Sequence, residues 1–166
     1  MPETLPDTDG NAVAVVDADA PASVVVFTCN HCPYALAWHE RLNAVARDYG
    51  PRGVHVVQVN ANDAERYPRD SLDAMRERVA GGEFATPYLH DATQELARDW
   101  DAKVTPDVYV VAPDGAVLYR GAPDADYQDE SRNAQWLRDA LDDVLAGRPV
   151  RVPATEPKGC SIKWRQ

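Results

Sequence analysis

The chain has 166 residues, of which 45% are hydrophobic and 27% are charged, as is typical of one soluble globular domain. Its 27 acidic and 17 basic residues give a net charge of −10, which disfavours binding to nucleic acid or to anionic lipid. The sequence contains no apolar run long enough to span a membrane, and its acidic start lacks the features of a secretory signal. We therefore expect a cytoplasmic protein with no nucleic-acid partner and no membrane partner.

The first half of the chain alternates predicted strands and helices. The segment "DTDGNAVAVV" predicts a small β-hairpin, because turn residues separate two short alternating runs. The run 23–28 ("SVVVFT") is typical of a strand that is buried on both faces. Apolar residues then recur at helical intervals from Pro33 to Tyr49, and proline suits the first turn of a helix. A second strand in "GVHVVQVNAND" and a second helix in "DSLDAMRERVAGG" follow.

The second half completes the predicted fold. It contains a short strand in "TPYLHD", a helix in "TQELARDW", a pair of strands joined by "APDG", and a closing helix in "SRNAQWLRDALDDVLAG". This order predicts an α/β fold of three layers, α/β/α, with a mixed central sheet and the hairpin as an N-terminal extension. The predicted domain covers residues 1–147. Residues 148–166 are expected to form an extended, proline-rich tail that docks on the same domain.

Cys29 and Cys32 form a C-x-x-C motif between the predicted buried strand and the following helix. Three cysteines are too few for a disulfide framework, so the motif indicates redox or metal chemistry. The N-terminus of a helix carries unpaired N–H groups and partial positive charge, which can lower a cysteine pKa from about 8.5 to roughly 3.5–7.5. Two thiols at this spacing can also form a disulfide reversibly. The motif therefore favours redox chemistry.

Four features taken together resemble the thioredoxin superfamily: a buried strand, C-x-x-C-P, a helix, and a distant "VTP" just before a strand. The N-terminal hairpin and the extra elements before "VTPDVYVV" are more similar to its redoxin branch, which includes alkyl hydroperoxide reductase, thiol-specific antioxidant and thiol-reductase relatives. The resemblance covers residues 6–147. It implies a thioredoxin-like fold and a thiol–disulfide oxidoreductase with no cofactor. Its partners would be a protein disulfide or small-thiol substrate and an electron-donating thiol system.

The resemblance also implies roles for individual residues. Cys29 would attack a partner disulfide, and Cys32 would then attack Cys29 and release the reduced partner. The peptide bond between Thr105 and Pro106 would be cis and would lie against the cysteines. There it would bind the substrate together with Pro33.

His31 precedes Cys32, as in protein disulfide isomerase. The resemblance implies that His31 favours the thiolate of Cys29 and makes the pair less reducing than thioredoxin; the alternative is a solvent-exposed loop residue. Thioredoxin has a buried Asp where this chain has Ser23, and the thiol-reductase relatives have a Glu where it has Ala35. The sequence shows no replacement for either carboxylate.

Three other functions remain open. A peroxiredoxin-like thiol peroxidase carries P-x-x-x-T-x-x-C, but with Cys32 as the peroxidatic cysteine the threonine position is Cys29 and the proline position is Val25. A copper chaperone of the same fold would use both cysteines and a histidine, although such relatives carry C-x-x-x-C. No other metal site is expected, because no second ligand pair has zinc spacing and Pro33 excludes haem attachment. The third alternative is a redox-inert binding module with a static disulfide.

Cys160 lies in the tail, within "KGCSIKW". Gly159 allows a sharp turn, and Ile162 and Trp164 alternate as apolar anchors, so we expect the end of the tail to dock. The simplest interpretation is that Cys160 is a small buried hydrophobic residue. The alternative is a third redox thiol that reaches the C-x-x-C pair, with the tail acting as an internal substrate.

Overall fold

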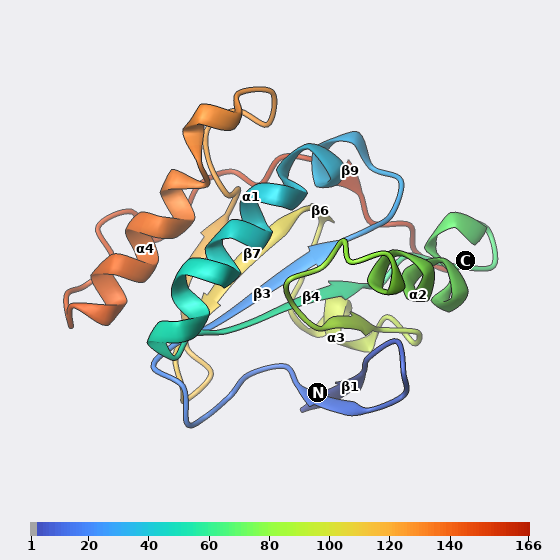
Figure 1. The fold of residues 1–166 in the computed structure, drawn as a ribbon, viewed down its shortest axis with the longest axis horizontal. Helices are drawn as coiled ribbons and strands as arrows, with labels where there is room; N and C mark the ends of the chain where they lie inside the picture. The colour runs from blue at the N-terminus through green and yellow to red at the C-terminus, as the bar shows by residue number, and fades with distance from the viewer. Residues whose placement is uncertain (1–2) are drawn as a thin grey trace.

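A computed structural model describes residues 3–166 and has a five-stranded mixed sheet at its centre (Figure 1). In spatial order the strands are β5 (Tyr88–His90), β4 (His55–Asn60), β3 (Ser23–Thr28), β7 (Asp107–Val111) and β8 (Val117–Gly121). β3, β4 and β5 run parallel to one another, whereas β7 is antiparallel to both of its neighbours. The central strand β3 is the predicted buried strand, and all six of its residues are buried.

Helices cover both faces of this sheet. They are α1 (Pro33–Tyr49), α2 (Leu72–Ala80), α3 (Glu95–Asp99) and α4 (Gln135–Leu145), with short 3-10 helices η1 (Gly50–Arg52), η2 (Pro68–Asp70) and η3 (Glu130–Arg132). α1 and α4 pack on one face of the sheet, and α3 packs on the other. α2 contacts the edge strand β5. The predicted three-layer α/β fold is confirmed.

The predicted hairpin consists of β1 (Thr4–Pro6) and β2 (Ala12–Ala14), which pair antiparallel. It lies on the same face of the sheet as α3, and its Leu5 is buried in the core there. In Figure 1 it lies at the bottom of the molecule. The hairpin is therefore an N-terminal extension that covers one face of the domain, as the sequence predicts.

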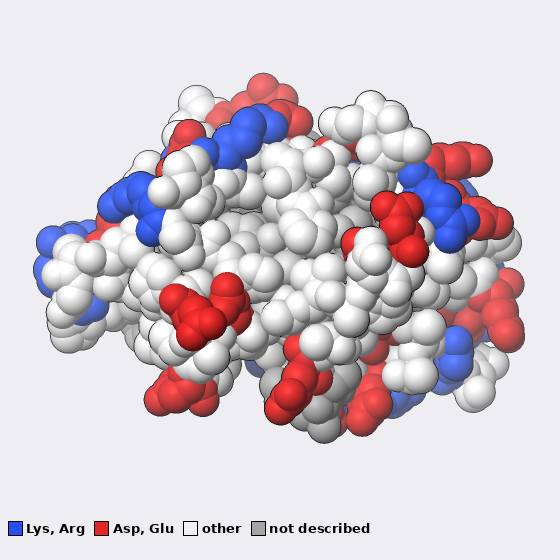
Figure 2. Space-filling view, turned by 60° about the horizontal axis from the view of Figure 1, so that its bottom comes forward, with Lys and Arg blue, Asp and Glu red and all other residues white. Residues whose placement is uncertain are grey.

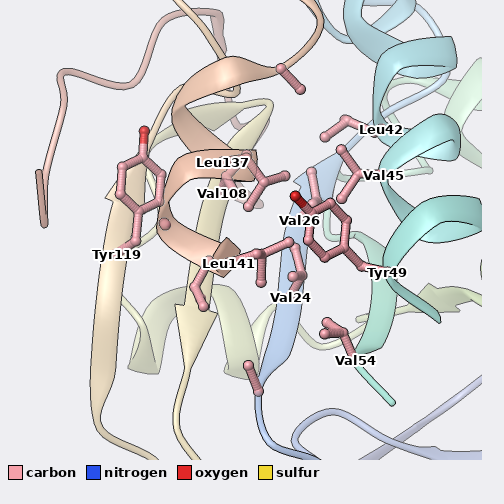
Figure 3. Packing of buried hydrophobic residues seen from close by; sticks show 14 of the residues in the cluster. Val24, Val26, Leu42, Val45, Tyr49, Val54, Val108, Tyr119, Leu137 and Leu141 are labelled. Carbon is pink, nitrogen blue, oxygen red and sulfur yellow. The ribbon is translucent and has the colours of Figure 1, made fainter. Parts of the chain in front are cut away.

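The core beneath α1 and α4 follows from the alternation of side chains along β3. Val24 and Val26 point to this face, where they pack with Leu42 of α1 and with Leu137 and Leu141 of α4 (Figure 3). The intervening residues of β3 point into a second core on the opposite face. Since both faces of β3 are covered, the strand holds the start of the next segment, which contains the C-x-x-C motif, in a fixed place.

α3 and α4 begin later than the sequence predicts. Gln94 has a φ of 63°, and α3 starts only after it. Asn133 and Ala134 have φ values of 55° and 52°, and they separate η3 from α4. Residues in the left-handed region cannot continue a right-handed helix, and apolar spacing alone does not reveal them.

The tail after α4 runs back across the molecule to the region of α2 (Figure 1). Along β8, the Thr155 N–H donates to the Arg120 carbonyl (3.0 Å), and the Arg120 N–H donates to the Pro153 carbonyl (3.1 Å). Further on, β9 (Cys160–Ser161) pairs antiparallel with β6 (Val104–Thr105). The tail is extended and docked, and it reaches the residue before Pro106.

The surface reflects the acidic composition. Acidic side chains form separate groups over the face shown in Figure 2, and much of the centre of that face carries neither acidic nor basic side chains. Within residues 3–166, none of the helices has the length and apolar character needed to cross a membrane.

Candidate active site

The two cysteines of the motif lie where β3 ends and α1 begins. Cys29 directly follows β3, and Cys32 is the N-cap residue of α1, with Pro33 in the first turn as predicted. Both cysteines are buried, with 2% and 0% of their surface exposed, and both are free thiols. The strand and the helix thus bring the two sulfur atoms together at the carboxyl end of the sheet, where α/β folds commonly bind substrates.

Thr105 contacts both cysteines. Its hydroxyl lies 3.4 Å from the Cys29 sulfur, and its carbonyl accepts from the Cys32 thiol at 3.3 Å. The peptide bond between Thr105 and Pro106 is cis, which confirms the prediction for this bond. Pro33 is exposed beside the motif. The structure therefore brings together the cysteines and the segment that was predicted to bind substrate.

The contacts around Cys32 hold the pKa of its thiol at about 4, well below its usual range. Hydrogen bonds from Cys29, from Cys160 and from the Ala35 N–H in the first turn of α1 stabilise a thiolate there. The hydrogen bond to Cys32 and burial raise the pKa of Cys29, and the nearby Asp70 carboxylate adds to this effect. The reduced pair therefore holds one proton and one negative charge. These contacts favour the charge on Cys32, whereas the resemblance implies a thiolate on Cys29.

A buried carboxylate that the sequence analysis missed lies beside Cys29. Asp70, at the end of η2, is fully buried. One of its oxygens accepts from the Asn30 N–H (2.7 Å) and from the Asn60 side chain (3.1 Å). The other accepts from the Asn62 side chain (3.0 Å) and lies 2.6 Å from Nδ1 of His31. Asp70 thus supplies a carboxylate to the site from a position distant in sequence from the cysteines.

The sequence does not reveal Asp70, because no motif spacing relates it to the cysteines. A weaker signal was present: Asn60 and Asn62 stand at the carboxyl end of β4, the parallel neighbour of β3. Polar side chains at that edge meet those that follow β3. They indicate where a buried polar partner such as Asp70 would be held.

His31 lies between Asp70 and an aromatic ring. Its side chain is 20% exposed, and its ring stacks parallel to that of Tyr67, with 5.8 Å between the ring centres. His31 is therefore an ordered residue of the site rather than a free loop residue. Its immediate partner is Asp70, and its effect on the Cys29 thiolate stays a prediction.

The loop between the cysteines is held by further polar contacts. The side-chain oxygen of Asn30 accepts from Arg78 (2.8 Å) and from the Tyr88 hydroxyl (2.7 Å), and its amide donates to the Arg69 carbonyl (2.8 Å). Burial raises the pKa of the Tyr88 hydroxyl, so it stays a hydrogen-bond donor. Asn30 thus links the motif to η2, α2 and β5, which fixes the position of the sulfur atoms.

Ligand-type atoms of Cys29, His31 and Asp70 all lie within 4.8 Å of one another. This set differs from the metal ligands that the sequence suggests, which are both cysteines and a histidine. Both oxygens of Asp70 already accept hydrogen bonds from amide groups, so a metal would have to compete with them. The arrangement is better suited to fixing a carboxylate than to receiving an ion.

Cys160 lies beside the pair. It is partly exposed, faces Thr105 across the β6–β9 pairing and contacts Cys32. Burial and the contact with Cys32 raise the pKa of its thiol to about 11, so it is protonated at neutral pH. This placement differs from the simplest expectation, a buried hydrophobic residue, and it puts a third thiol at the site.

The model of the AhpC/TSA family matches residues 2–120. The chain belongs to the AhpC/TSA family. This confirms the resemblance to the redoxin branch of the thioredoxin superfamily, whose members use thiol chemistry. No curated protein matches the chain.

Two solved structures share the fold over almost the whole chain. An uncharacterised conserved protein from Geobacillus kaustophilus is 41% identical, with a TM-score of 0.89, over 99% of this chain and 89% of that one. A hypothetical protein from Sinorhizobium meliloti 1021 is 34% identical, with a TM-score of 0.85, over 98% and 90%. Both alignments extend beyond the segment matched by the AhpC/TSA family model and include the tail.

A more distant structure shows the same fold. It is a secreted disulfide oxidoreductase from Mycobacterium tuberculosis, 18% identical, with a TM-score of 0.56, over 69% of this chain and 78% of that one. At this identity the likeness concerns the fold alone. The AhpC/TSA family membership supports oxidoreductase chemistry in general and leaves the particular reaction to be argued from the site.

Proposed function

We propose that this protein is a thiol–disulfide oxidoreductase in which Cys29 and Cys32 exchange a disulfide with a protein or a small thiol. The observation that carries the proposal is the contact of both sulfur atoms with Thr105. Its hydroxyl is placed to donate to a Cys29 thiolate, while its carbonyl accepts from a Cys32 thiol. This arrangement supports a reactive Cys29, whereas the other contacts of the pair favour the charge on Cys32.

The reaction begins with a shift of the shared proton from Cys29 to Cys32. The Cys29 thiolate attacks one sulfur of a partner disulfide, and the other sulfur leaves as a thiolate that takes up a proton. Cys32 then loses its proton to solvent and attacks the Cys29 sulfur. A Cys29–Cys32 disulfide forms, and the second partner thiol is released. The partner gains two electrons and two protons, and an electron-donating thiol system returns the pair to its dithiol form.

Asp70 and His31 act as positioning residues in this proposal. Asp70 fixes the Asn30 N–H and the His31 ring, so the loop keeps the geometry of the two sulfur atoms. No metal or organic cofactor takes part. We further propose that the protein works in a reducing compartment such as the cytoplasm, where a thiol donor can turn it over.

Peroxide reduction is the second candidate, because the family model is that of AhpC/TSA proteins. In that reaction a thiolate would take one oxygen from the peroxide and be oxidised to a sulfenic acid, which the second cysteine would convert to a disulfide with loss of water. The sequence lacks the expected threonine and proline of the peroxidase motif. The site instead offers two neighbouring thiols and the Thr105 backbone, which favours disulfide exchange.

The test is equilibration of the reduced protein in glutathione buffers. We expect a reversible two-electron couple between about −270 and −180 mV, the range from thioredoxin to protein disulfide isomerase. In the Cys160→Ser protein, Cys29→Ser and Cys32→Ser should each abolish this couple. Peroxide consumption and the metal content of the purified protein are measured on the same samples. Absence of the couple would refute the proposal, and rapid peroxide consumption or a stoichiometric metal would then indicate which alternative holds.

A further inference from the structure

The tail occupies the backbone edge that adjoins the two cysteines. β9 pairs with β6 so that Cys160 stands opposite Thr105, the residue that contacts both Cys29 and Cys32. The Cys160 side chain packs against the C-x-x-C pair and contacts Cys32. The tail therefore presents a cysteine in an extended strand directly at the redox pair.

Glycines allow the tail to come this close. A Cβ atom on Gly159 would lie 2.0 Å from the carbonyl oxygen of Thr105, so any side chain there would push the tail away. At the other end of the crossing, a Cβ atom on Gly121 would lie 2.0 Å from the Thr155 hydroxyl. Two close approaches of backbone thus hold the tail against the domain on either side of residues 156–158.

Contacts after Cys160 fix its position further. The side chain of Gln94, which is 1% exposed, donates to the Lys163 carbonyl (2.9 Å) and accepts from the Arg165 N–H (3.0 Å). The Lys163 N–H donates to the side chain of Asn62 (2.9 Å), a residue that also binds the Asp70 carboxylate. These contacts hold the tail on the carboxyl side of Cys160.

We propose that Cys160 is a third redox thiol, which forms a disulfide with Cys32. This inference rests on the proposed function, since the Cys29–Cys32 disulfide is its starting point. Cys160 loses its proton to solvent and attacks the Cys32 sulfur. The Cys29–Cys32 bond breaks, a Cys32–Cys160 bond forms, and Cys29 leaves as a thiolate that is then protonated. One disulfide replaces another, so no further oxidant is consumed.

This step would move the disulfide from a buried position to a more exposed one. Cys29 and Cys32 are almost completely buried, whereas Cys160 is partly exposed. Exchange with a bulky protein donor is faster at the more exposed sulfur of a disulfide. Moving the disulfide to Cys160 therefore brings it to the surface, where the donor reduces it. Cys160 relays electrons from the donor to the buried pair.

Peptide mapping tests the disulfide directly. The Cys29→Ser protein is reduced, treated with oxidised glutathione, alkylated and digested with trypsin. We expect the peptide 159–163, which contains Cys160, to be linked to the peptide 1–41, which contains Cys32. The Cys32→Ser protein should not form this link. Absence of the link in Cys29→Ser, or equal amounts in both variants, would refute the proposal.

A matched pair of glycine variants tests the role of the tail. Gly159→Ala should reduce the link at least about tenfold, because the added Cβ atom displaces Cys160 and exchange depends on access to the attacked sulfur. Gly50→Ala is the control, since Gly50 has a φ of −56° and no atom would lie within 4 Å of its Cβ atom. Both glycine variants are made in the Cys29→Ser protein, in which the link to Cys32 is measured. An undiminished link in Gly159→Ala would show that the seated tail is not required.

Reduction kinetics test the relay. Cys160→Ser should be reduced by thioredoxin about tenfold more slowly than the unaltered protein, but by dithiothreitol at a rate within about twofold. Equal rates with thioredoxin would refute the relay. The proposed function is judged separately, because Cys160→Ser keeps the Cys29–Cys32 couple. If that couple is present and the link to Cys160 is absent, only the relay fails; if the couple itself is absent, the proposed function fails.

Discussion

Two buried carboxylates near α1 have different partners. Asp124, which is 2% exposed, binds Arg41 at 2.8 Å and accepts from the Trp38 indole and the Ala134 N–H, both at 2.9 Å. Its charge partner is a guanidinium, which stays charged at any pH a folded protein meets. This carboxylate ties α1 to the start of α4.

Asp70 is equally buried, but its partners are three amide groups and the ring of His31. It also lies close enough to Cys29 to raise the pKa of that thiol. Burial alone therefore does not separate a structural carboxylate from one that acts on a site. The partners of each carboxylate do separate them. The permanent counter-charge beside Asp124 stabilises the fold, whereas the amides and the histidine around Asp70 leave a net field that acts on the thiols.

The largest expected effect is on stability at Asp124. Arg41→Ala should lower the free energy of unfolding by about 3–5 kcal/mol, because it leaves a buried carboxylate without its counter-charge. Arg47→Ala is the control: Arg47 pairs with Glu40 at the exposed surface, and its loss should cost less than about 1 kcal/mol. Chemical denaturation of the reduced proteins measures both. Similar losses in the two variants would contradict a structural role for the buried pair.

Asp70→Asn should have a smaller effect on stability and a specific effect on redox poise. We expect a loss of about 1–3 kcal/mol from unmatched hydrogen bonds. Removing the charge beside Cys29 stabilises the reduced form, so the reduction potential should become less negative by about 30 mV, a tenfold change in the equilibrium constant. Asp124→Asn is the matched control, and its potential should not move. An equal shift in both variants would mean that the two carboxylates do not differ in this respect.

The pH dependence of the potential tests the shared proton. Because the pKa of Cys32 is about 4, the reduced pair binds one proton across neutral pH, and the potential should fall by about 30 mV per pH unit between about pH 5 and 8. If both thiols were protonated, it would fall by about 60 mV per unit. The lowered pKa also stabilises the reduced fold fully above pH 9, and this contribution is lost as the pH falls toward 4.

His31→Gln should have the smallest effect. Nδ1 of His31 lies 2.6 Å from an Asp70 oxygen, so His31 acts on the pair by holding that carboxylate in place. A glutamine keeps a donor for the carboxylate, and we expect the potential to shift by less than about 30 mV. Glutathione equilibration again provides the measurement. A shift larger than that of Asp70→Asn would show that His31, rather than Asp70, sets the field at the pair.

Local patterns in the sequence predict much of the fold and half of the site. The apolar run of β3, the helical spacing after Pro33 and the cysteines between them are all contained in residues 23–49, so their joint placement follows from short-range rules. The cis bond before Pro106 was predicted through the resemblance. Asp70 was not, because it reaches the site through a 3-10 turn whose place depends on side-chain contacts across the sheet.

The contact between Cys160 and Cys32 could not be predicted either. It depends on the register of β9 against β6, and a shift of one residue would turn the cysteine away from the site. The sequence predicts a turn at Gly159. In the structure, the backbone of Gly159 lies so close to the Thr105 carbonyl that no side chain would fit there. A resemblance to a family predicts the positions of its motif residues. The position of a docked tail depends instead on packing, which the motif does not specify.

The pairing of β9 with β6 also sets an order of events during synthesis. β3, α1 and β6 leave the ribosome well before Cys160, and domains can begin to fold as they emerge. For a time the newly made chain therefore holds Cys29 and Cys32 beside an open β6 edge, without the third thiol. The third thiol reaches the pair only once the tail is seated, so a nascent protein and one with a seated tail should respond differently to the same oxidant.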